Sequence, residues 1–213
     1  MKTVIHYIHD PLCGWCYGAH ALVDALYNRV PGKYDIVLHG GGLFPKAPLS
    51  ATQRGFIRSA DARIGKLTGQ TFGAAYLDGL LNDADTVYDS AMPIRAILAA
   101  DLVEAGSGLP MLKALQRAHY RSGLSIAQKA TIDAVANGVG LDATRFDIAF
   151  NQIGESELAQ HLGQTQKLMR TVDAQGFPTF VIQAGERFER VPHDRFYGDP
   201  AKFADMIFER SFC

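Results

Sequence analysis

The stretch Asp10-Pro11-Leu12-Cys13-Gly14-Trp15-Cys16-Tyr17-Gly18 decides how the rest of the chain is interpreted. Its two cysteines are separated by two residues, directly after an apolar run (residues 4–8) and directly before a segment with helical spacing (residues 19–27). Cys13 would therefore stand at the N-terminus of a helix, with Cys16 over the same face one turn later. The unpaired N–H groups and partial positive charge of that helix end favour a thiolate, the form that attacks a disulfide. The stretch thus predicts a redox-active dithiol.

The residues on either side of the two cysteines predict a β-α-β unit. Residues 3–9 are rich in β-branched and aromatic side chains and predict a strand, residues 13–29 predict a helix, and residues 34–39 predict a second strand. A right-handed crossover would make the two strands parallel. The run Gly40-Gly41-Gly42 lacks the companion residues of a phosphate-binding loop, so we expect a tight turn that passes close to the active site.

The middle of the chain, residues 51–171, shows helical spacing and no convincing strand. Ser50 and Asp142 are candidate N-caps of two of its helices. Strand patterns return at residues 179–183 and 187–191, and a closing helix follows from about residue 200. The simplest account is one α/β domain, residues 1–49 plus 172–213, interrupted by an all-helical insertion over residues 50–171.

Composition and charge exclude several classes of function. The chain has 213 residues, a net charge of -1 and no basic tract, so we expect neither nucleic acid nor a membrane as partner. Three cysteines, the third being Cys213 at the last position, do not make a structural disulfide framework. No secretory signal pattern precedes the first strand, so we expect a cytoplasmic location, although a chain whose signal had been removed would look the same.

A second motif, Gly176-Phe177-Pro178-Thr179-Phe180, stands at the start of the returning strand pattern, where a proline is tolerated. Together with Cys13-Gly14-Trp15-Cys16 and the long helical insertion, it resembles the DsbA family of thiol–disulfide oxidoreductases. The nearest branch is the cytosolic, FrnE-like group of predicted protein-disulfide isomerases. The resemblance covers essentially the whole chain and implies a thioredoxin-like fold with a large all-helical insertion.

The same resemblance implies roles for individual residues. Cys13 would be the attacking thiolate, Cys16 the resolving thiol, and Pro178 a cis-proline that faces both. The substrates would be protein or peptide disulfides and thiols. No bound cofactor or metal is implied, with glutathione as a candidate co-substrate and glutathione or thioredoxin as the candidate recycling partner.

Substrate contacts are expected at Gly14, Trp15 and Phe177. Trp15 would offer an exposed apolar surface, and Phe177 would border the substrate groove. Gly14-Trp15 replaces the Pro-His found between the cysteines of DsbA itself, which removes one source of thiolate stabilisation. We therefore expect a less oxidising disulfide, suited to a reductase or isomerase.

Three other interpretations remain open at this point. A C-x-x-C pair can form half of a zinc site, but zinc needs four ligands, and His6, His9 and His20 are the nearest candidates in sequence. Glutathione-dependent enzymes of the kappa-transferase and chromene-carboxylate isomerase type share the expected architecture but typically carry serine at the attacking position. A chaperone-like or redox-sensing binder could use the same groove without catalysis.

Overall fold

The computed structural model describes residues 3–29 and 34–211, so Cys213 lies outside the described residues. In chain order, the first half contains β1 (Thr3–His9), α1 (Gly14–Gly18), α2 (His20–Arg29), β2 (Tyr34–Gly40), β3 (Ala47–Pro48), α3 (Ala51–Thr68), the π-helix η1 (Ala75–Leu80), β4 (Val87–Tyr88) and α4 (Ala91–Val103). The second half contains α5 (Gly108–Tyr120), α6 (Lys129–Gly138), α7 (Ala143–Gln152), α8 (Glu155–Thr171), β5 (Thr179–Ala184), β6 (Arg187–Val191), the 3-10 helix η2 (Asp194–Phe196) and α9 (Pro200–Ser211). Within these ranges no helix has the length and hydropathy of a membrane span.

A four-stranded mixed sheet in the order β2-β1-β5-β6 forms the centre of the molecule. β1 and β2 run parallel, as the β-α-β pattern predicts, with Ile5 opposite Ile36. β5 returns antiparallel to β1, with Tyr7 opposite Phe180, and β6 completes the hairpin. Strands from the two ends of the chain thus pair with each other, which places the Phe177-Pro178 motif beside the start of α1.

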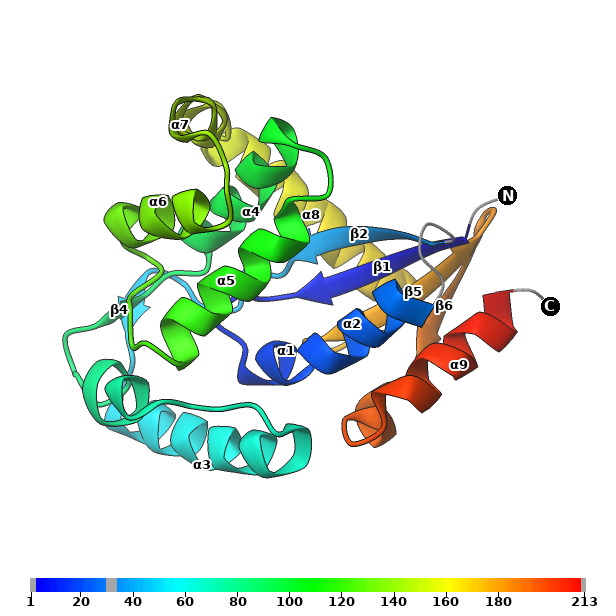
Figure 1. Ribbon diagram of the computed structural model, residues 1–213, viewed down its shortest axis with the longest axis horizontal. Coiled ribbons are helices and arrows are strands. Elements are labelled where there is room, and N and C mark those ends of the chain that lie inside the picture. Colours follow the sequence, from blue (N-terminus) through cyan, green and yellow to red (C-terminus); the bar gives the residue numbers. More distant parts are fainter. Residues whose placement is uncertain (1–2, 30–33, 212–213) are drawn as a thin grey trace.

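Helices cover both faces of this sheet (Figure 1). On the face of α1, α2 and α9, the ring of Tyr7 stacks on Phe180 with centroids 4.8 Å apart, and Phe203 of α9 meets Phe180 edge-on at 5.1 Å. On the opposite face lies α8, where Nε2 of His161 accepts a hydrogen bond from the backbone N–H of Gly40 at 2.8 Å. The arrangement is the thioredoxin-like sandwich that the resemblance implies.

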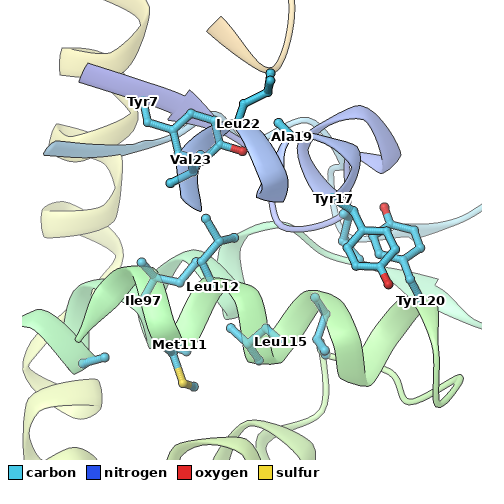
Figure 2. Packing of buried hydrophobic residues seen from close by; sticks show 14 of the residues in the cluster. Tyr7, Tyr17, Ala19, Leu22, Val23, Ile97, Met111, Leu112, Leu115 and Tyr120 are labelled. Carbon is cyan, nitrogen blue, oxygen red and sulfur yellow. The ribbon is translucent and has the colours of Figure 1, made fainter. Parts of the chain in front are cut away.

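The helical segment shares a continuous core with the sheet domain. Figure 2 shows Leu112 and Leu115 of α5 below Leu22 and Val23 of α2. Beside them the rings of Tyr17 and Tyr120 stack with centroids 4.9 Å apart. Helix α5 of the insertion therefore packs against α2 and, through Tyr17, against α1, the helix that follows Cys13 and contains Cys16.

Local predictions hold in most places and fail in two. Ser50 caps α3 and Asp142 caps α7, each side chain accepting a backbone hydrogen bond in the first turn. The single helix predicted over residues 13–29 is wrong, because α1 ends at Gly18 and Ala19 separates it from α2. The absence of a strand from residues 51–171 is also wrong: β4 pairs with β3 over two residues, too few to leave an alternating pattern.

Candidate active site

Cys13 is the N-cap residue of α1 and has extended backbone angles (φ -90°, ψ 116°). A turn places it there, because its N–H donates to the Asp10 carbonyl at 3.1 Å and its own carbonyl accepts from the Tyr17 N–H at 3.1 Å. The side chain is 8% exposed. The Cys13 sulfur therefore stands at the positive end of a short helix, as the spacing of the motif predicts.

Cys16 lies one turn further along α1 and is completely buried. Both cysteines are free thiols and contact each other. The backbone N–H of Asp10 donates to the Cys16 sulfur at 3.4 Å. Burial, followed by the contact with Cys13, raises the pKa of the Cys16 thiol well above its usual value. Cys13 keeps 8% of its surface exposed and Cys16 keeps none, so Cys13 is the better placed of the two to meet an incoming disulfide.

The Phe177-Pro178 peptide bond is cis, as the resemblance implies, and the Phe177 carbonyl lies beside the Cys13 thiol. The Cys13 thiol donates a weak hydrogen bond to the Phe177 carbonyl at 3.5 Å. The ring of Phe177 in turn packs on Gly41, where an added Cβ would overlap it. The prediction that the glycine run passes close to the active site is therefore confirmed, and its reason is the space that Phe177 needs.

A groove of about 640 Å³ opens beside the cysteines and is lined by Trp15 and by the Phe177-Pro178 segment. Trp15 is half-buried rather than fully exposed, because its ring lies 5.2 Å from that of Tyr197. The Tyr197 hydroxyl also donates to the Trp15 carbonyl at 3.2 Å. Arg63 and Arg190 line the same groove and bring two guanidinium groups to it. Asp194 lines the groove as well, so its lining combines apolar side chains with charges of both signs.

Asp10 belongs to the quoted stretch, yet its sequence position alone gave it no role. Its carboxylate is fully buried and accepts hydrogen bonds from the Leu12 N–H (2.9 Å), the Leu43 N–H (2.7 Å) and the Ser90 hydroxyl (2.9 Å). Burial raises its pKa to about 6, against the opposing effect of these donors. Asp10 thereby ties the cysteine turn to the loop after β2 and to the start of α4.

Gly14 lies against α3, because a Cβ at this position would overlap Oδ1 of Asp61 and crowd Ile64. Its expected contact with substrate stays a prediction. Asp61 is a buried carboxyl group that sequence reasoning missed. The available signal was its position on the apolar stripe of α3, between Ile57 and Ile64, where a charged residue is out of place.

Of the three histidines considered for zinc, His6 and His20 contact other side chains through their ring nitrogens, and the ring nitrogens of His9 are buried without a hydrogen-bond partner. His6 contacts His39 at 2.9 Å and Gln183 at 2.8 Å through its two ring nitrogens. His20 pairs with Gln116 at 2.5 Å. Within residues 3–29 and 34–211, no three His, Cys, Asp or Glu side chains are grouped to hold a metal ion.

Residues 4–197 match the family model of the DSBA-like thioredoxin domain. The chain belongs to the DsbA-like thioredoxin family. Cytosolic disulfide reductase DsbM from Pseudomonas aeruginosa is 38% identical over 98% of both chains, with a TM-score of 0.90. The structure of DsbM with GSH gives a TM-score of 0.89 at the same identity, over 99% of this chain and 100% of that one.

A 2-hydroxychromene-2-carboxylate isomerase shares the fold alone, at 13% identity and a TM-score of 0.59 over 98% of both chains. A comparison with curated proteins gave no match. The family and the Cys13–Cys16 pair together make the chain a DsbA-like disulfide oxidoreductase.

Proposed function

We propose that the chain is a cytoplasmic disulfide reductase or isomerase that acts on protein and peptide disulfides and is recycled by glutathione. The observation that carries this proposal is the pairing of Cys13, which is 8% exposed, with the fully buried Cys16, across from the Phe177 carbonyl and next to an open groove. The likeness to a cytosolic disulfide reductase supports both the direction and the compartment.

The reaction begins at the Cys13 sulfur. As a thiolate it attacks one sulfur of a substrate disulfide, forming the Cys13–substrate bond while the other substrate sulfur leaves as a thiolate and takes up a proton. The N-terminus of α1 stabilises the attacking charge. Extended substrate backbone can lie along the Phe177-Pro178 segment, while Trp15 supplies apolar contact.

Cys16 completes the transfer. After losing its proton it attacks the Cys13 sulfur, releases the substrate as a second thiol and leaves the Cys13–Cys16 disulfide. The substrate has then gained two electrons and two protons, and the enzyme has lost both. The raised pKa of the Cys16 thiol, caused first by burial, keeps this sulfur protonated until a mixed disulfide forms beside it.

Two molecules of glutathione can restore the dithiol, giving glutathione disulfide. Glutathione carries two carboxylates, and the groove offers Arg63 and Arg190 as partners for them. The structure of DsbM with GSH supports glutathione as a ligand of this family branch. At the cytosolic glutathione poise, about -220 mV or lower, the enzyme would rest as a dithiol.

Insulin reduction and refolding of scrambled ribonuclease, both with glutathione present, test the proposal. Cys13→Ser should lower both activities by at least about 100-fold because it removes the nucleophile. Cys16→Ala should accumulate a mixed disulfide on Cys13, visible by mass spectrometry. Cys213→Ser is the matched control, since it removes the third thiol and leaves the pair. Equal activity of Cys13→Ser and the unchanged protein would refute the proposal.

The second candidate is a glutathione-dependent transferase or isomerase of small molecules, favoured by the shared fold with a chromene-carboxylate isomerase. The intact cysteine pair stands against it. Turnover of an electrophile with glutathione that survives Cys16→Ala would support this candidate.

The reduction potential of the Cys13–Cys16 pair tests the direction of the proposed disulfide exchange. A value near about -270 mV would favour a reductase, whereas one near about -120 mV would indicate an oxidant.

A further inference from the structure

Helix α3 of the insertion presents a carboxyl group to the first turn of α1. Asp61 is 2% exposed, and its Oδ1 lies so close to the Gly14 Cα that an added Cβ would overlap it. Gly14 immediately follows Cys13 in the sequence. The Asp61 carboxyl group therefore lies against the first residue of α1, next in sequence to the cysteine that carries the attacking sulfur.

A hydrogen bond holds the carboxyl group of Asp61 in place, but within residues 3–29 and 34–211 no cationic side chain pairs with it. The Tyr76 hydroxyl donates to Oδ2 at 2.8 Å. Burial raises the pKa values of Tyr76, Tyr88 and Tyr120, and the charge of Asp61 contributes to each of the three increases. On α3 itself, Arg58 turns outward to Asp78 and to the Leu77 carbonyl. None of the ion pairs found among the described residues includes Asp61.

We propose that Asp61 is a positioning residue of the redox reaction, whose carboxylate disfavours negative charge on Cys13 and so makes the dithiol a stronger reductant. The proposal rests on the role of Cys13 as the attacking thiolate. A second anion at the same helix end competes for the partial positive charge and repels the thiolate directly. The reduced protein carries that thiolate and the disulfide form does not, so the repulsion favours the disulfide form.

The effect should depend on pH, because Asp61 acts only when ionised. Burial raises the pKa of Asp61 to about 7, while the Tyr76 hydroxyl opposes the increase. Asp61 should therefore penalise the Cys13 thiolate at pH 8 and lose most of this influence at pH 6. If Asp61 had a purely structural role, replacing it would change the stability of the Cys13–Cys16 disulfide by the same factor at pH 6 and at pH 8.

The experiment measures the equilibrium of the Cys13–Cys16 disulfide with glutathione in the full chain at pH 6 and pH 8. At pH 8, Asp61→Asn should shift the equilibrium constant about tenfold toward the dithiol, which corresponds to a potential about 30 mV less negative. At pH 6 the shift should be smaller than about twofold. The thiolate absorbance of the reduced protein at pH 8 should increase in the same variant.

Asp78→Asn is the matched control, since it removes an exposed carboxylate from the neighbouring η1 and should leave both quantities unchanged. Tyr76→Phe serves as an independent variant if Asp61→Asn does not fold. It removes the donor that favours the Asp61 carboxylate and should give a smaller shift in the same direction. An unchanged equilibrium constant at pH 8 in a folded variant would overturn the proposal. Because the equilibrium uses glutathione alone, failure to reduce insulin would bear on the proposed function and not on Asp61.

Discussion

At the scale of single residues, Asp10 is the side chain on which the geometry of the cysteine turn depends. Three donors converge on its carboxylate, from Leu12, Leu43 and Ser90. Asp10→Asn keeps the shape but turns an NH₂ group toward these donors. We expect a loss of about 2–4 kcal/mol in the free energy of unfolding, because buried donors would lose their acceptor. Urea unfolding at pH 7.5 measures it.

Ser90→Ala is the comparison for this prediction: it leaves the Asp10 carboxylate with its backbone partners but removes one donor, and it also removes the acceptor of the Phe44 N–H. It should lower the free energy of unfolding by about 1–2 kcal/mol, less than Asp10→Asn, because the Leu12 and Leu43 N–H groups keep their acceptor. Asp10→Asn should also slow the reduction of insulin, since the Asp10 N–H contacts the Cys16 sulfur. Equal stability of the Asp10→Asn and Ser90→Ala variants would show that the three segments are held together by other contacts.

At the scale of elements, the end of β2 and the Phe177-Pro178 segment form one wall of the site. Gly41→Ala would place a methyl group on the Phe177 ring and push it into the groove. We expect insulin reduction to decrease by about 10- to 100-fold through misplacement of the substrate. The free energy of unfolding should decrease by about 1–3 kcal/mol.

Gly55→Ala in α3 is the matched control for Gly41→Ala, because no atom lies within 4 Å of the added Cβ. It should stabilise the protein by about 0.5–1 kcal/mol through helix propensity and leave activity unchanged. If Gly41→Ala kept full activity, the position of the Phe177 ring would not matter for substrate binding.

The sequence predicts those elements whose signals are local. The strands of the central sheet follow from alternation and β-branched content, and Ser50 and Asp142 are caps because capping depends on a few consecutive residues. The two-residue pairing of β3 with β4, in contrast, joins residues about 40 positions apart in the chain. The close approach of Asp61 to Gly14 is of the same kind, since residues 47 positions apart meet only after folding.

At the scale of the whole molecule, burial of neutral histidines dominates the response to acid. Burial lowers the pKa values of His9 and His119 to about 3 and those of His20 and His39 to about 4. Between these values and about 6.5, the unfolded chain binds more protons than the folded one, so stability decreases as the pH is lowered. The two buried carboxyl groups with raised pKa values, those of Asp10 and Asp61, act in the opposite direction and are fewer.

His9 offers the clearest test, because both of its ring nitrogens are buried without a hydrogen-bond partner. His9→Leu should be at least as stable as the unchanged protein at pH 7.5, where it replaces an unpaired polar ring by an apolar side chain. At pH 5 its advantage should grow by about 2 kcal/mol, since the variant no longer excludes a proton that the unfolded chain takes up at about 6.5. Urea unfolding at the two pH values gives this difference. Tyr27→Leu, at a side chain that is 60% exposed, should instead follow the pH dependence of the unchanged protein. An advantage of His9→Leu that is the same at both pH values would mean that His9 does not contribute to acid unfolding, and that the proton uptake lies with the other buried histidines.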